Sequence, residues 1–282
     1  MTSGAPILLF NRALRLVVAP KGSPTGIEIK DLRVAFSVSK TLKPEPNTAE
    51  IKIWNLNGDH RSQLEQLPTA LVTLEAGYVA GTSLLFSGEL RTSLTVREGP
   101  DLITTLASAD GEKAHRTARV NVAIKKGMPA DKVIKEVAKA LGVTPGNLDA
   151  ALSKIKASPL RTLFSEGTVV TGQASREMTA LCRSCGLVWS IQDGKLQLLG
   201  LREALEGSAI LLAPSTGLIG SPTVDNEGVL SVRTLIIPDL IPGRKIVVES
   251  ERLKGQYRVE TTQHAGDNGA DDWYVDVEAK RY

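Results

Sequence analysis

Aromatic residues are scarce in this chain, at 4% of 282 positions, and there are only two cysteines. Few aromatic side chains weaken any proposal of base stacking on nucleic acid, and they leave the core to Leu, Val, Ile and Ala. Two cysteines cannot supply a disulfide framework. No apolar run approaches a membrane span or the core of a secretory signal. The sequence therefore predicts a protein of about two or three small domains, synthesised and folded in a reducing cytoplasm.

The net charge is also small, at +3, but it is unevenly distributed. Gly111–Gly186 contains 13 Lys and Arg against 6 Asp and Glu. A channel lining, a nucleic-acid groove or a surface for an acidic partner would explain this excess. Solvated helix faces would explain it equally well.

The two ends of the chain show the period-two alternation of strands with one buried face. Val34, Phe36 and Val38 are an example, and Lys43-Pro-Glu-Pro-Asn47 interrupts it because two prolines cannot continue a strand. A turn is predicted at Ala76–Thr82 and a short helix at Asp59–Gln66. Strands are predicted at 14–18, 27–29, 34–38, 49–53, 71–75, 84–86, 94–96 and 102–106, and short strands return after residue 200.

The middle of the chain has helical spacing instead. Helices are predicted at 129–141, 147–155 and 175–185, and Asp193-Gly194 between two apolar runs predicts a hairpin. The expected fold is mainly β with an α+β middle: two small β-barrel or sandwich domains flanking a helix-containing domain. The predicted boundaries are 1–110, 111–200 and 201–282.

Cys182-Arg-Ser-Cys185 has the spacing of a redox or zinc motif. A reactive thiol needs a helix N-terminus, whereas this pair lies near the C-terminal end of its predicted helix. Zinc needs two further ligands, and no second pair is present. We interpret both cysteines as small core residues.

His264, Asp267, Asp271 and Asp272 gather near the end of the chain. Their residue types would suit a metal or a general base, but Asp267-Asn-Gly269 is a turn signature. Trp273 and Tyr274 then lead into a strand. We interpret the cluster as the residues that shape the last hairpin.

The sequence contains no nucleophile elbow, P-loop, dinucleotide fingerprint or HExxH motif. We therefore predict no catalytic activity, cofactor or metal. The alternative hypotheses are a cell-wall-degrading enzyme, with Glu166, Glu177 and Asp193 as the nearest carboxylates, and a nucleic-acid-binding module through the basic middle.

Four segments in order resemble the baseplate hub proteins of contractile-tailed bacteriophages and of prophage-derived tails. The cysteines depart from that pattern, at positions where small or polar residues are expected. The segments are Phe36–Leu56, Leu85-Phe-Ser-Gly-Glu-Leu90, Leu181-Cys through Gly186-Leu-Val-Trp-Ser-Ile-Gln-Asp-Gly-Lys-Leu196, and the final third from Gly217-Leu-Ile-Gly220 to Asp272-Trp-Tyr274.

The resemblance implies a structural protein of the virion tail baseplate: a homo-trimeric ring with two β-barrel domains per chain. The ring would join the tail tube to the central spike, contact other baseplate proteins and enclose the channel for genomic DNA, which it would touch without sequence preference. Within that hypothesis, Pro44, Pro46 and Asn47 are predicted to reach a neighbouring subunit, because their loop is too rich in proline to pair within a sheet.

Overall fold

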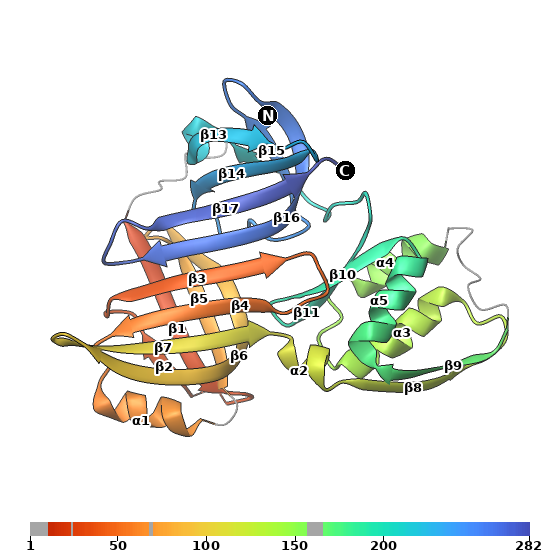
Figure 1. Cartoon of the computed structure of the whole chain (residues 1–282), viewed down its shortest axis with the longest axis horizontal. Coiled ribbons are helices and arrows are strands. Elements are labelled where there is room, and N and C mark those ends of the chain that lie inside the picture. The colour runs from red at the N-terminus through yellow and green to blue at the C-terminus, as the bar shows by residue number, and fades with distance from the viewer. Residues whose placement is uncertain (1–10, 24, 68–69, 157–165) are drawn as a thin grey trace. The chain divides into compact units, whose positions relative to one another are not determined.

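A computed structural model of the chain describes residues 11–23, 25–67, 70–156 and 166–282. The described residues fall into two compact units, shown in Figure 1. The first unit takes in the described residues within 1–40, 48–109 and 206–281. The second takes in the described residues within 41–47 and 110–205.

The first unit is built on one large sheet in which the two ends of the chain meet. The strand order is β13-β14-β17-β16-β3-β4-β7-β6-β5-β1-β2, with β15 paired to β16 and β12 to β15. The neighbours β16 and β3 therefore join the last β region to the first (Figure 1). The strands are β1 (Arg12–Pro20), β2 (Ile27–Ile29), β3 (Val34–Thr41), β4 (Asn47–Trp54), β5 (Ala70–Tyr78), β6 (Gly81–Glu98), β7 (Asp101–Asp110), β12 (Ile210–Leu212), β13 (Leu218–Val224), β14 (Val229–Leu235), β15 (Lys245–Glu249), β16 (Lys254–Asp267) and β17 (Trp273–Lys280); α1 is Gly58–Gln66 and the 3₁₀ turn η2 is Pro214–Thr216.

Alternation of buried and more exposed side chains explains why these segments form strands. Along β4, Ala49, Ile51 and Ile53 are buried while the residues between them are exposed. Along β17, Val275 and Val277 are buried while Asp276 between them is half-buried. The buried faces form two hydrophobic clusters, one mainly from the first β region and one from the last. Burial of these apolar faces is the main favourable contribution to folding.

The segment after β5 differs from the sequence prediction. The expected strands at 84–86 and 94–96 are one continuous strand, β6, with a register shift between Leu90 and Thr92. The turn predicted over Ala76–Thr82 is much shorter, because β5 extends to Tyr78 and β6 begins at Gly81. Gly77 permits this with a φ of +156° and lies where a Cβ would meet backbone atoms of Gly81.

The second unit confirms the predicted α+β middle. Helices α3 (Ala130–Leu141), α4 (Leu148–Lys156) and α5 (Ala174–Ser184) and the hairpin β10 (Leu187–Gln192) with β11 (Lys195–Gly200) lie where the sequence predicts them. Gly142 ends α3 with a φ of +69°, a left-handed conformation that glycine adopts without strain. The sequence prediction missed α2 (Glu112–Arg116) and the ribbon of β8 (Arg119–Ile124) with β9 (Thr168–Gln173), which α3 and α5 cover (Figure 1).

The predicted fold class, mainly β with a helix-containing middle, is therefore confirmed. Among the described residues the strand order is open, from β13 to β2, and the sheet is sandwich-like rather than a closed barrel. The division at residues 110 and 200 into three domains stays a prediction. None of the helices in the described ranges is both long enough and apolar enough to cross a membrane.

Candidate functional site

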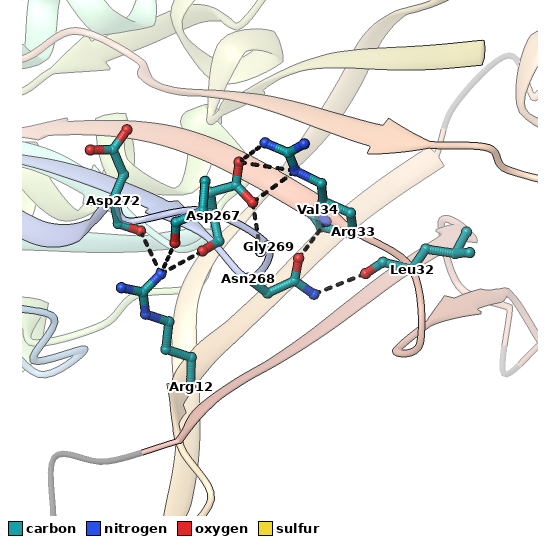
Figure 2. A network of polar contacts seen from close by, with 9 residues as sticks. Arg12, Leu32, Arg33, Val34, Asp267, Asn268, Gly269 and Asp272 are labelled. Carbon is teal, nitrogen blue, oxygen red and sulfur yellow. Dashed lines mark hydrogen bonds and ion pairs between the residues drawn. The ribbon is translucent and has the colours of Figure 1, made fainter. Parts of the chain in front are cut away.

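The turn between β16 and β17 contains the acids that the sequence singled out, and Figure 2 shows its contacts. The Asp267 carboxylate is almost buried and accepts hydrogen bonds from Arg33 Nη2 at 2.9 Å and Arg33 Nε at 3.2 Å. It also accepts a hydrogen bond from Gly269 N at 2.7 Å. Burial raises the pKa of Asp267, but these hydrogen bonds outweigh it, so the pKa lies below its ordinary value. Asp267 is therefore an ionised anchor of the turn.

Arg12, at the start of β1, holds the same turn through backbone atoms. Its Nη1 donates to Asp267 O at 2.8 Å (Figure 2), and its Nη2 donates to Asp271 O at 2.8 Å. It also donates to the carbonyl oxygens of Ala270 and Asp272. The side chains of Asp271 and Asp272 remain exposed. These two acids thus contribute their carbonyl groups, and not their carboxylates, to this junction.

Asn268 completes the attachment to the first β region. Its Oδ1 accepts a hydrogen bond from Val34 N at 2.7 Å, and its Nδ2 donates to Leu32 O at 2.9 Å (Figure 2). One side chain therefore satisfies a donor and an acceptor of a chain segment more than 230 residues away. We call Arg12, Arg33, Asp267 and Asn268 the hairpin junction. The interpretation of the Asp267 turn as structural is confirmed.

His264 lies on β16 close to the hairpin junction but takes no part in it. Its side chain is fully buried, and neither ring nitrogen has a hydrogen-bond partner among the described residues. Burial, with a smaller contribution from the nearby Lys40 ammonium, lowers the pKa of His264 to about 3. The imidazole is therefore neutral at physiological pH, in the interior of the sheet structure.

The two cysteines are core residues, as the sequence predicts. Cys182 and Cys185 are free thiols and are only 1% and 5% exposed. Burial raises the pKa of both thiols, which is the opposite of what nucleophilic or redox chemistry requires. They pack in the hydrophobic cluster of the second unit, with Trp189 and Met178 among the members.

The carboxylates named for the enzyme hypothesis do not assemble into a site. Glu166 is exposed and pairs with Lys126 at 3.3 Å. Asp193 occupies the tight turn between β10 and β11 with a φ of +53°, and Glu177 lies on α5. In the described part of the chain, no three His, Cys, Asp or Glu residues are grouped as metal ligands would be.

The loop from Thr41 to Asn47 belongs to the second unit, although it joins two strands of the first unit's sheet. Asn47 is buried, and its Nδ2 donates to Ile191 O at 2.8 Å and to Gln192 Oε1 at 3.0 Å. Gln192 Nε2 donates in turn to Thr41 O at 2.8 Å. Pro44 is exposed and Pro46 is half-buried. Both prolines therefore lie on a loop that is fixed by buried hydrogen bonds.

A groove of about 650 Å³ lies over β13, β14, β16 and β17. Its charged side chains have partners: Arg233 donates to both carboxylate oxygens of Asp276, at 2.6 and 2.8 Å, and Glu278 accepts from Thr261 at 2.9 Å. The remaining lining is mostly Ser, Thr and Gln. The groove is polar without a free charge that would favour one ligand class.

Apolar side chains are exposed on two strands of the first unit. On β6, Leu94 is 62% exposed and Val96 is 46% exposed. Over 93–98, the pairings of the described residues place β7 on one side of β6 and no strand on the other. On β13, which is a terminal strand of the sheet, Ile219 and Val224 are 40% and 45% exposed. These edges carry no signal in the sequence, because alternation reveals which residues share a face but not which strand lacks a neighbour.

This chain matches a known protein family. The sequence model of a family described as baseplate hub gp41 matches residues 14–279. Among curated protein sequences, none matches the chain.

Several solved structures share the fold at low sequence identity. A tail protein from Neisseria meningitidis MC58 has a TM-score of 0.64 at 12% identity, covering 96% of this chain and 97% of that one. The 43 kDa tail protein of prophage MuSo2 from Shewanella oneidensis has a TM-score of 0.61 at 9% identity, covering 95% and 98%. The c3393 protein of the E. coli type VI secretion system has a TM-score of 0.54 at 9% identity, covering 94% and 76%.

Proposed function

Because this chain belongs to the baseplate hub gp41 family, and is thus a structural component of a bacteriophage tail, we propose that it forms the hub ring of a contractile tail. In this proposal the ring is a homo-trimer that joins the tail tube to the central spike and encloses a DNA channel. The chain is synthesised in the host cytoplasm and is assembled into the virion baseplate. The family match over 14–279 is the observation that carries this proposal.

The exposed edges of the sheet support assembly. Unpaired strand edges with apolar side chains are sites at which another chain pairs. β6 and β13 are different surfaces, and contact between two different surfaces of identical chains is head-to-tail, which closes into a ring when the rotation permits. The exposed Leu94 and Ile219 would become buried in such a contact.

Similar structures support a partner on the side of this chain that would face the spike. The E. coli protein is described as similar to the T4 tail proteins gp27 and gp5, and structures of Francisella VgrG were determined with PdpA. We propose a tail spike protein as the corresponding partner of this chain, with the tail tube and other baseplate proteins on its remaining surfaces.

We also propose that Pro44 and Pro46 contact a neighbouring subunit. Asn47 has a different role, because its side chain is buried and bonded within its own unit. Replacing Pro44 and Pro46 together with Ala should weaken assembly more than the folding of the single chain. Equal loss of both would show that the loop serves only the fold.

The molecular mass of the protein in solution tests the proposed ring directly. Light scattering after gel filtration should give about three times the 30.1 kDa chain mass. Leu94→Lys places a charge on the β6 edge and should shift the mass toward that of one chain. Val79→Lys is the matched control, because Val79 is 72% exposed at the β5–β6 turn. A wild-type chain that stays monomeric at high concentration and does not bind a spike protein would refute the proposal.

Catalysis is not part of the proposed function. The family is a structural one, and the carboxylates of the enzyme hypothesis are dispersed. Release of cell-wall fragments by the purified protein would contradict this. DNA in the channel would make non-specific contacts, so any binding should weaken steeply with added salt.

A further inference from the structure

A second groove, of about 310 Å³, lies in the second unit between α5 and the Thr41–Asn47 loop. Its lining residues are Pro44, Ser175, Arg176, Thr179, Ala180 and Arg183. Arg176 and Arg183 are both exposed, seven residues apart on the helix. At about 1.5 Å rise per residue, this spacing separates their Cα atoms by about 10 Å along one face.

The two arginines differ from two lysines on a neighbouring helix of the same unit. On α3, Lys135 pairs with Asp149 at 2.8 Å and Lys139 with Glu136 at 2.7 Å. Neither Arg176 nor Arg183 has an ion pair with another described residue. Lys135 and Lys139 on α3 are therefore neutralised by nearby acids, whereas the charges of Arg176 and Arg183 are available in the α5 groove.

The hydroxyl groups of the groove are already used by the fold. Ser175 Oγ donates to His115 O at 2.9 Å. Thr179 Oγ1 donates to Ser175 O at 2.8 Å and accepts from Trp189 Nε1 at 3.0 Å. The guanidinium groups are thus the available hydrogen-bond donors of the lining side chains, and both favour carboxylate or phosphate oxygens.

The opposite wall is held in place. Asn47 and Gln192 fix the loop through the hydrogen bonds already described, two of them between buried groups. Pro44 therefore presents a rigid apolar surface opposite the helix. A preformed groove loses less conformational entropy when it binds a ligand.

We propose that this groove binds an extended acidic segment of a partner protein. Residues two and four apart in an extended chain are about 6.6 and 13 Å apart, so their carboxylates bracket the separation of the two arginines. The Pro and Ala residues of its lining suit contact with a peptide backbone. Nucleic acid is less favoured, because the lining contains two cations and no aromatic ring for base stacking. A neighbouring subunit and the acidic segment would both contact Pro44, so we propose that the segment binds the unassembled chain, and the inference does not depend on ring assembly.

Fluorescence anisotropy of the full chain with a labelled peptide of alternating glutamate and serine tests the proposal at low salt. The double variant Arg176→Gln, Arg183→Gln should weaken binding about ten-fold, because two exposed charge pairs with the peptide are lost. The matched control is Lys135→Gln, Lys139→Gln, which removes the same charge from α3 and should change affinity less than about two-fold. Both variants should melt at the wild-type temperature, because neither pair of residues is buried.

Three results would overturn the proposal. Equal weakening by the two double variants would show only a general charge effect, and no peptide binding would show that the groove is not a site. Tighter, equally arginine-dependent binding of a thymidine oligonucleotide of the same charge would assign the groove to nucleic acid. Peptide binding lost only in the α5 variant, with weaker oligonucleotide binding, would support it.

Discussion

Two pairs of arginines in this protein have opposite environments. Arg12 and Arg33 in the hairpin junction are satisfied by carbonyl groups and by the buried Asp267 carboxylate. Arg176 and Arg183 on α5 face a groove and have no acidic partner among the described residues. The first pair links chain segments more than 230 residues apart, so it stabilises the fold. The second pair contributes little to the fold and is available for a ligand.

The two pairs of arginines also show which charged residues stabilise the fold and which are available to bind a ligand. A buried, hydrogen-bonded charge costs several kcal/mol to leave unpaired, whereas an exposed charge costs almost nothing. Substitutions in the hairpin junction should therefore destabilise the first unit. Substitutions in the α5 groove should change binding alone.

Lowering the pH should cause the largest loss of folding stability. The pKa of His264 is about 3 in the folded state against 6.5 for an ordinary histidine, so the unfolded chain binds the proton more readily. Stability is full above about pH 6.5 and falls as the pH drops toward 3, by about 3 kcal/mol between pH 7 and pH 4. Urea unfolding at both pH values measures this loss.

The variant His264→Leu should remove most of that loss, while His60→Gln, at a partly exposed position, should retain it. His115, whose pKa is also lowered by burial, contributes its own decline in both variants. An unchanged pH dependence in His264→Leu would contradict the assignment to His264.

Asp267→Ala should have the next largest effect. It removes a nearly buried carboxylate and leaves Arg33 and the Gly269 amide without their acceptor. We expect a loss of about 2 kcal/mol in the free energy of unfolding, measured at neutral pH. Asp267→Asn keeps an acceptor for Gly269 and should lose about half as much. A change below about 0.5 kcal/mol in Asp267→Ala is typical of a substitution at a surface site, and it would show that the junction is not structural.

The smallest effect is expected in the α5 groove. Arg176→Ala together with Arg183→Ala should change the free energy of unfolding by less than about 0.5 kcal/mol, because both side chains are exposed and unpaired. The melting temperature in a calorimeter measures this. A large loss would mean that these arginines support the fold, and the contrast between the two pairs would fail.

Local patterns in the sequence predicted much of the fold. Alternation at Ala49, Ile51 and Ile53 predicts β4, and helical spacing that ends at Gly142 predicts α3. Asp193-Gly194 predicts the β10–β11 hairpin, whose turn needs two residues with positive φ. These features depend on neighbours in the sequence, which is why composition and spacing reveal them.

The sequence also predicted the role of the Asp267 turn, but not its partners. The residue types of Asp267-Asn-Gly269 alone predict a turn. Nothing in the sequence connects Arg12 and Arg33 to that turn. Exposed cations and junction cations look alike in a sequence. Only the three-dimensional arrangement reveals which of them has an acid nearby.

The sequence by itself determined the type and approximate position of most elements, the burial of the two cysteines and the family resemblance. The tertiary structure alone decided that β3 and β16 are neighbours, that the Thr41–Asn47 loop belongs to the second unit, and that Arg176 and Arg183 line a groove. The reason is physical. Strand alternation and helix caps are local preferences, whereas pairing between distant segments depends on burial and hydrogen bonds that form only when the chain is folded.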